Sequence, residues 1–306
     1  MTRVFIDGSA GTTGLRIGER LASRADIELI SLPGELRKDR AAREEAINSA
    51  DVAFFCLPDE AAIEAAALVH GPTVVIDTST AHRTAEGWAY GFPELQGKRE
   101  RIAASKRIAN PGCHASGFIS LVEPLVRAGL IDGATPLSCF SVTGYSGGGK
   151  KMIGEYEAEG RSPLLDSPRQ YALGQQHKHL KEMTKLCSLE VPPIFCPIVA
   201  DYYSGMQVTV PLHKKQIRGT AEDIAELYAE YYGSGLVHFD PLAEGAGLLA
   251  ANALTGRDDM SVTVAGNGER ILLISTFDNL GKGASGAAIQ NMNLVLGMDE
   301  TMSLAL

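Results

Sequence analysis

The first hundred residues alternate short β-branched and aromatic runs with segments of helical composition. Strands are predicted at 4–6, 27–30, 52–55 and 73–76, and helices near 14–24, 38–49 and 59–69. Strands separated by such helices run parallel, because each helix carries the chain back along the sheet. This part of the chain is therefore restricted to a parallel sheet with helices on both faces, an α/β fold.

A glycine-rich turn follows the first predicted strand. Its glycines are spaced G-x-x-G-x-x-G and lead into the first helix. Glycines at this place allow a tight turn and bring backbone N–H groups and a helix N-terminus up to a pyrophosphate. We therefore predict a Rossmann-type dinucleotide-binding domain, and a plain strand-to-helix turn is the alternative. The residues expected to contact the dinucleotide here are Gly8, Ser9, Gly11, Thr12, Thr13 and Gly14.

The end of the second predicted strand carries no acidic residue. An NAD site usually has an Asp or Glu there to bind the ribose 2′-OH. This chain has Ser31, followed by Arg37, Lys38 and Arg40. A hydroxyl and cations suit a 2′-phosphate, so we predict NADP(H) as the cofactor, with Ser31 and Arg37 among its contacts. In the alternative, these cations are only the solvated face of the second helix.

From about residue 136 the predicted strands become longer. They lie at 137–142, 207–212, 261–265 and 270–277, with helices at 220–232 and near 284–297. These longer strands, with few helices between them, indicate a mixed or antiparallel sheet in a second, α+β domain. We predict that residues 1–112, completed by a C-terminal helix of about 284–306, bind NADP, and that 113–283 form a catalytic and dimerisation domain.

Charge and cysteine content narrow the functional class. The 37 acidic residues outnumber the 28 Lys and Arg, which gives a net charge of −9 and disfavours adhesion to nucleic acid or an anionic membrane. No apolar stretch approaches the length of a membrane span, so we expect a cytoplasmic protein. Five cysteines, an odd number, argue against a disulfide framework, and they lack zinc-site spacing; no metal is predicted.

Cys113 differs from the other cysteines. Pro111 and Gly112 end the preceding segment and a helix is predicted to begin after them. The thiol therefore lies at a helix N-terminus, which stabilises a thiolate. Its place after the parallel strands, where dinucleotide folds bind ligands, makes Cys113 the predicted nucleophile; a buried packing thiol is the alternative.

A nucleophilic thiol needs a base, and one short segment offers it. His177, His179 and Glu182 lie within six residues. A carboxylate beside an imidazole would orient the ring and hold its tautomer. A polar surface stretch is the alternative.

Six segments that span nearly the whole chain carry a further signal: 8–14, 90–95, 109–113, 143–150, 177–182 and 278–286. Together, and in this order, they resemble the N-acetyl-gamma-glutamyl-phosphate reductase family, in its shorter type, within the aspartate-semialdehyde dehydrogenase-like superfamily. The resemblance implies NADPH-dependent reduction of N-acetyl-glutamyl 5-phosphate to its semialdehyde, with release of phosphate, in arginine biosynthesis. It also implies a small acyl phosphate as substrate. A homodimer or homotetramer is expected.

The resemblance also implies roles for single residues. Cys113 matches the nucleophile that forms a thioester, and His177 the acid/base, with His179 and Glu182 orienting it or contacting substrate. The nicotinamide is expected beside Asn279, Lys282 and Gly283, and the substrate's anionic groups beside Arg83, Ser146 and Lys150. Rival assignments are aspartate-semialdehyde dehydrogenase, an aminoadipyl-phosphate reductase, or a catalytically silent NADP-sensing protein.

Overall fold

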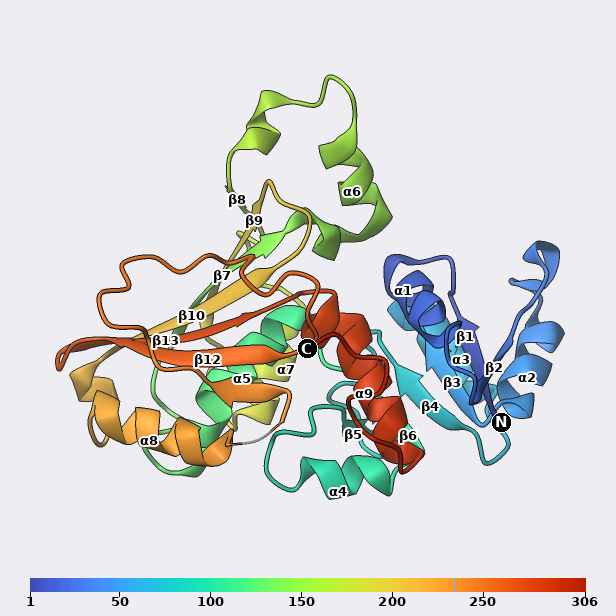
Figure 1. Cartoon of the computed structure of the whole chain (residues 1–306), viewed down its shortest axis with the longest axis horizontal. Coiled ribbons are helices and arrows are strands. Elements are labelled where there is room, and N and C mark those ends of the chain that lie inside the picture. The colour runs from blue at the N-terminus through green and yellow to red at the C-terminus, as the bar shows by residue number, and fades with distance from the viewer. Residues whose placement is uncertain (234) are drawn as a thin grey trace. The chain divides into compact units, whose positions relative to one another are not determined.

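The chain forms two structural units, each with its own sheet and core (Figure 1). The computed structural model describes residues 1–233 and 235–306. Unit 1 comprises Met1–Pro111 and Ala284–Ala305, and unit 2 comprises Gly112–Gly283 with Leu306. No helix in the described part of the chain is long and apolar enough to cross a membrane.

Unit 1 is built on a six-stranded sheet in the order β2-β1-β3-β4-β6-β5, with every neighbouring pair parallel. This confirms the predicted Rossmann-type α/β fold. Two predicted strands have the observed bounds, whereas the fourth lies one residue later than expected. The strands are β1 (Thr2–Asp7), β2 (Ile27–Ile30), β3 (Val52–Phe55), β4 (Val74–Asp77), β5 (Ala89–Tyr90) and β6 (Arg107–Ala109); the helices are α1 (Thr12–Leu21), α2 (Arg40–Ser49), α3 (Asp59–Ala67), α4 (Lys98–Ala103) and α9 (Gly286–Val295).

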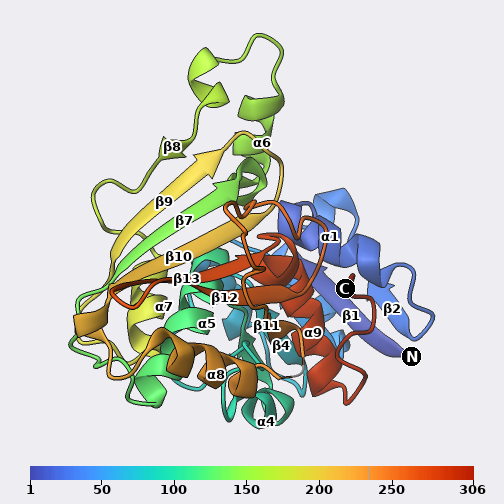
Figure 2. The same ribbon diagram turned by 60° about the vertical axis from the view of Figure 1, so that its left-hand side comes forward.

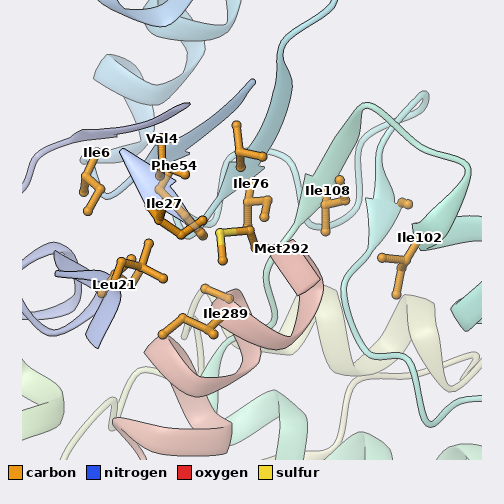
Figure 3. Close-up of a cluster of buried hydrophobic side chains, with 14 residues drawn as sticks. Val4, Ile6, Leu21, Ile27, Phe54, Ile76, Ile102, Ile108, Ile289 and Met292 are labelled. Atoms are coloured by element: carbon orange, nitrogen blue, oxygen red, sulfur yellow. The ribbon is translucent and has the colours of Figure 1, made fainter. Parts of the chain in front are cut away.

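Both faces of this sheet are buried, because successive strand residues point to opposite sides. Phe54 belongs to a cluster with residues of α1, α4 and α9, whereas Phe55 packs with residues of α2 and α3. Figure 3 shows Ile289 and Met292 of α9 directed at this first cluster. The C-terminal helix thus supplies core side chains, each worth about 1.5–3 kcal/mol on burial, to the N-terminal sheet.

Unit 2 holds a seven-stranded mixed sheet in the order β11-β12-β13-β10-β7-β9-β8 (Figure 2). Parallel pairs occur at β11/β12 and β7/β9, and the other pairs are antiparallel. The predicted mixed sheet is confirmed. The strands are β7 (Ser138–Gly144), β8 (Arg169–Gln170), β9 (Ile194–Ala200), β10 (Met206–His213), β11 (Val237–Phe239), β12 (Met260–Gly266) and β13 (Arg270–Phe277); the helices are α5 (Cys113–Arg127), α6 (Gly149–Glu157), α7 (His179–Leu186) and α8 (Ala221–Tyr231).

The two faces of this second sheet differ. Helix α5 packs on β10 and β13 and contacts α7 and α8. The opposite face leaves large apolar side chains exposed: Phe140 at 44%, Ile194 at 61% and Leu272 at 37%. Helix α5 therefore begins against one face of the sheet, and its first residue is Cys113.

Candidate active site

A cavity of about 370 Å³ lies along the glycine turn of unit 1. Its lining includes Gly8, Ser9, Ser31, Arg37 and Lys38. The structure thus brings the two predicted parts of the dinucleotide site, the turn and the second-strand end, to one cavity. Arg40 begins α2 and is not part of this lining.

The glycines of the turn are required by close backbone approach. Gly8 has φ +86°, and a Cβ on it would lie 2.2 Å from the carbonyl oxygen of Cys56. A Cβ on Gly14 would lie 2.5 Å from the Gly8 oxygen. Helix α1 begins at Thr12, and no side chain in the described residues caps it. Its N-terminus therefore presents backbone donors, which fits a pyrophosphate.

An ion pair beside this turn was not predicted. Arg43 of α2 donates from Nε and Nη2 to Oδ2 of Asp7, at 3.0 and 2.8 Å. Asp7 ends β1 and is 5% exposed. Arg43 thus neutralises the negative charge of Asp7, which would otherwise repel a bound pyrophosphate. Sequence spacing offered no signal for it, since Arg43 follows three other cations that could equally face the solvent.

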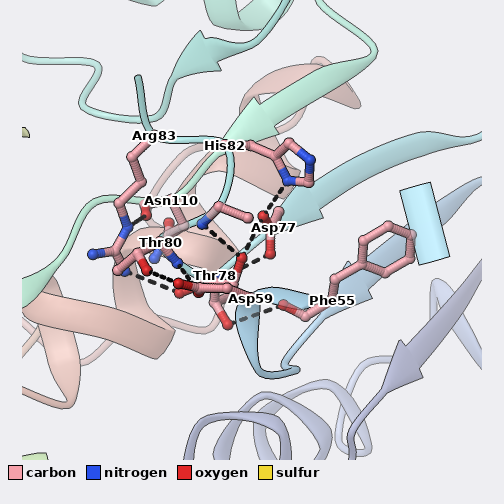
Figure 4. A network of polar contacts seen from close by, with 10 residues as sticks. Phe55, Asp59, Asp77, Thr78, Thr80, His82, Arg83 and Asn110 are labelled. Atoms are coloured by element: carbon pink, nitrogen blue, oxygen red, sulfur yellow. Dashed lines mark hydrogen bonds and ion pairs between the residues drawn. The ribbon is translucent and has the colours of Figure 1, made fainter. Parts of the chain in front are cut away.

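The loop after β4 is held by a buried aspartate (Figure 4). Asp77 accepts hydrogen bonds from the backbone N–H and the hydroxyl of Ser79, at 2.9 and 2.7 Å. His82 Nδ1 lies 2.6 Å from Asp77 Oδ2, and the imidazole stacks on Trp88 with ring centroids 4.0 Å apart. The aspartate therefore fixes the conformation of this loop.

Arg83 extends the same network to the segment before Cys113. Its Nε donates to the carbonyl oxygen of Asn110, and Nη2 to that of Thr78, both at 2.9 Å. Asn110 in turn donates through Nδ2 to the Ala284 oxygen at 3.0 Å. Figure 4 shows the guanidinium between these loops. The Arg83 guanidinium thus joins two backbone segments of unit 1. Its contact with substrate stays a prediction.

Cys113 is half-buried and is the first residue of α5, with Gly112 at the N-cap. The Gly112 N–H donates to Oε1 of Glu182 at 2.8 Å, and this carboxylate is 2% exposed. Gly283 lies against the cysteine, since a Cβ on it would be 2.9 Å from Cys113 Cβ. The thiol is thus positioned at a helix N-terminus, and Glu182 holds the backbone next to it.

The other cysteines have different surroundings. Burial raises the pKa of Cys56 to about 12, and it raises the pKa values of Cys139 and Cys187. These three thiols stay protonated at neutral pH. They suit packing rather than nucleophilic attack.

Three histidine rings lie close together, and one of them, His114, directly follows Cys113 in α5. The ring centroids of His177 and His179 are 4.8 Å apart, and His114 lies 5.8 and 5.5 Å from them. His177 precedes α7, whereas His179 is its first residue. Burial, and then Lys178, lower the pKa of His177 to about 4. At neutral pH this imidazole is uncharged, and an uncharged imidazole can accept a proton.

His114 is the centre of a hydrogen-bonded chain. Its Nδ1 lies 2.7 Å from Ser141 Oγ, and its Nε2 lies 2.6 Å from the Tyr171 hydroxyl. Burial, and then His177, lower its pKa to about 3. Sequence reasoning missed Tyr171 and Ser141, because neither lies in a recognisable motif.

Of the remaining predicted residues, Asn279 and Ser146 are in contact, whereas the two lysines have different environments. Asn279 donates through Nδ2 to Ser146 Oγ at 3.0 Å and accepts from the Gly205 N–H at 2.9 Å. Lys282 is 2% exposed in the π-helical turn Gly281–Ser285, and Lys150 is exposed near the start of α6. The structure thus joins Asn279 to Ser146. No group of His, Cys, Asp and Glu in the described residues could hold a metal ion.

Comparisons with known proteins assign the class. Residues 33–105 match the family model "Semialdehyde dehydrogenase, NAD binding domain", and 113–279 match "Semialdehyde dehydrogenase, dimerisation domain". The fold resembles that of aspartate semialdehyde dehydrogenase II from Vibrio cholerae, with TM-score 0.72 and 18% identity over 97% of this chain and 99% of that one. It also resembles the aspartate semialdehyde dehydrogenase from Candida albicans with NADP, with TM-score 0.63 and 16% identity over 99% of both chains. Fold and domain matches together define an oxidoreductase of the semialdehyde dehydrogenase class.

Closer relatives specify the family. N-acetyl-gamma-glutamyl-phosphate reductase 2 from Nostoc sp. is 43% identical over 99% of both chains. The Pseudomonas putida protein of the same name is 46% identical over 96% of both, and the Rhizobium etli reductase is 45% identical over 96% of this chain and 98% of its own. The chain belongs to the N-acetyl-gamma-glutamyl-phosphate reductase family, as the sequence motifs indicated.

Proposed function

We propose that this chain reduces N-acetyl-L-glutamyl 5-phosphate to N-acetyl-L-glutamate 5-semialdehyde with NADPH, releasing phosphate, as a step of arginine biosynthesis. The observation that carries the proposal is the placement of Cys113. It is the first residue of α5, it directly precedes His114, whose ring lies 5.8 Å from that of the uncharged His177, and Glu182 holds the backbone N–H of Gly112. An acyl phosphate is an activated carbonyl with a good leaving group, and it needs a nucleophile and a proton acceptor of this kind.

In the first step, the Cys113 Sγ attacks the acyl carbon. A carbon–sulfur bond forms, and the carbon–oxygen bond to phosphate breaks, with its electron pair leaving on the phosphate. His177, uncharged in the free protein, takes the thiol proton and passes it to the leaving phosphate oxygen. The product of this step is a thioester on Cys113.

In the second step the thioester is reduced. Bound NADPH would supply the hydride for the acyl carbon. The carbon–sulfur bond then breaks, the aldehyde leaves, and the thiolate of Cys113 takes a proton from solvent. Over the cycle, one hydride and one proton are consumed for each aldehyde and phosphate released.

NADP(H) is the proposed dinucleotide, and the cavity in unit 1 supports this choice. Its lining joins Gly8 to Ser31, Arg37 and Lys38, which suits a pyrophosphate at one end and a 2′-phosphate at the other. Of the predicted nicotinamide contacts, Gly283 has the most direct support, since its backbone lies against the cysteine that carries the thioester.

The substrate contacts are proposed on chemical grounds. Ser146 can donate to an anionic oxygen, and Asn279 holds its hydroxyl in place. Lys150 is exposed near that serine in the chain, and we retain it, with Arg83 and His179, as a candidate for the phosphate or carboxylate.

Domain roles, assembly and location are also proposals. We assign NADP binding to residues 1–112 with 284–306, and catalysis and dimerisation to 113–283. A homodimer or homotetramer formed through the open face of the second sheet is supported by exposed Phe140, Ile194 and Leu272. Small polar substrates and the acidic chain fit a cytoplasmic enzyme.

The test is a panel of semialdehydes in the reverse reaction. Purified protein should reduce NADP when given N-acetylglutamate semialdehyde and phosphate. Cys113→Ser should abolish this activity, whereas Cys196→Ser, a matched change at another half-buried thiol, should retain it. Turnover of aspartate semialdehyde alone would refute the substrate, and activity in Cys113→Ser would refute the mechanism.

A further inference from the structure

The chain Ser141–His114–Tyr171 lies beside the nucleophile and has no part in the steps above. Its members come from β7, from the first turn of α5 and from the residue directly after β8. Ser141 is 0% exposed and His114 is 4% exposed. The two contacts are short, at 2.7 and 2.6 Å, so the imidazole is fixed by a hydroxyl at each nitrogen.

The direction of these hydrogen bonds follows from the number of protons on the ring. Burial lowers the pKa of His114 to about 3, so at neutral pH its ring has one N–H and one lone pair. Among residues 1–233 and 235–306, His114 is the only hydrogen-bonding partner of the Ser141 hydroxyl. A buried donor without an acceptor is strongly unfavourable. Ser141 therefore donates to Nδ1, and the ring proton lies on Nε2.

This arrangement leaves Tyr171 with a proton to give. The Nε2–H of His114 donates to the phenol oxygen. Unlike Ser141, Tyr171 is only partly buried, so its O–H is able to donate to solvent or to a bound ligand. Burial, and then the charge of Cys113, raise the pKa of Tyr171 above its ordinary value. The phenol thus stays protonated and lies within electrostatic range of the nucleophile.

We propose that Tyr171 is a further catalytic residue, whose hydroxyl donates a hydrogen bond to the acyl oxygen of the substrate attached to Cys113. The inference rests on Cys113 being acylated, as in the proposed function. When Sγ attacks, the carbonyl π pair moves onto this oxygen, and it returns to re-form the carbonyl as the leaving group departs. Tyr171 keeps its proton throughout and stabilises the negative oxygen, which is the role of an oxyanion-hole donor.

The test compares two reagents on the full-length protein. p-Nitrophenyl acetate acylates a thiol through an oxyanion, whereas iodoacetamide alkylates it by displacement with no oxyanion. Tyr171→Phe should slow acylation by about 100-fold, the usual effect of losing one such donor, and leave alkylation unchanged. Tyr231→Phe is the matched control, because its hydroxyl donates to Glu123 at 2.9 Å and it should change neither rate. Cys113→Ser gives the background.

Three results would overturn the inference. Unchanged acylation in Tyr171→Phe would show that the hydroxyl does not contact the acyl oxygen. Equal slowing of both reagents would show that it only positions the thiol. Acylation of Cys113→Ser as fast as that of the unmodified protein would show that Cys113 is not acylated. Neither reagent is an acetylglutamyl compound, so the proposed substrate can fail independently.

Discussion

Replacing Gly283 by alanine should displace the nucleophile without removing any functional group. A Cβ at this position would lie 2.9 Å from Cys113 Cβ and 3.2 Å from both the Asp278 carbonyl oxygen and a ring carbon of Phe277. Two carbon atoms are comfortable at about 3.5–4.0 Å. All of these neighbours belong to well-packed elements, so the methyl group cannot be accommodated by one flexible side chain.

The expected cost follows from this overlap. Adding a methyl group to a filled core costs about 1–3 kcal/mol, or a fall in melting temperature of about 2–4 °C per kcal/mol for a domain of this size. Relief of the clash requires Cys113 to move by several tenths of an ångström. A misplacement approaching 1 Å costs about 100-fold in rate. We therefore expect a large fall in kcat together with only a small fall in melting temperature.

Melting temperature, kcat and the iodoacetamide rate of Gly283→Ala provide the assay. Gly154→Ala in α6 is the matched control, because a Cβ added there would have no neighbouring atom within 4 Å, and it should keep full activity. A Gly283→Ala protein with unchanged kcat and melting temperature would refute the close packing of this turn on the nucleophile.

Three further outcomes follow from the site. Glu182→Ala should lower kcat and destabilise the protein by about 1–3 kcal/mol, because a buried N–H on Gly112 loses its acceptor; Glu182→Gln should largely restore both, since its amide oxygen can accept the same bond. Arg37→Ala should raise KM for NADP about tenfold, through loss of a charge-assisted contact, and leave KM for NAD unchanged. Because burial lowers the pKa of His114 to about 3, the unfolded chain binds more protons between pH 6.5 and 3; the urea midpoint should therefore fall with pH across this window, and less steeply in His114→Gln.

Each of these outcomes has a contrary result. Equal activity of the two Glu182 variants would show that the hydrogen bond from Gly112 to Glu182 has no role in catalysis. Equal loss of NADP and NAD affinity in Arg37→Ala would argue against a 2′-phosphate contact. For the pH series, His70→Asn is the control because that side chain is 65% exposed, and a slope reduced equally by this change would contradict the role of buried His114.

Local pattern predicted the first four strands of unit 1, most clearly β3, whose four residues are all apolar and buried. The bounds 27–30 and 52–55 agree with β2 and β3. Strand β9 was missed, since Pro197 lies inside it and proline normally argues against a strand interior. The two-residue strands β5 and β8 carry too few residues for any periodicity.

The candidate site was predictable only in part. Motifs located Cys113 and the histidine segment, because each is contiguous in sequence. The contact of Glu182 with Gly112 spans 70 residues, and the chain from Ser141 through His114 to Tyr171 joins three separate elements. Sequence spacing carries no information on such contacts, since tertiary packing alone brings these residues together.

The central claim is that catalysis passes through a thioester on Cys113. The most direct test incubates the protein with N-acetylglutamate semialdehyde and NADP without phosphate, and follows it by intact and peptide mass spectrometry. An acyl adduct on the peptide that contains Cys113, formed together with NADPH and released by added phosphate, is the predicted result. NADPH formation without an adduct, or an adduct on another cysteine, would contradict the account.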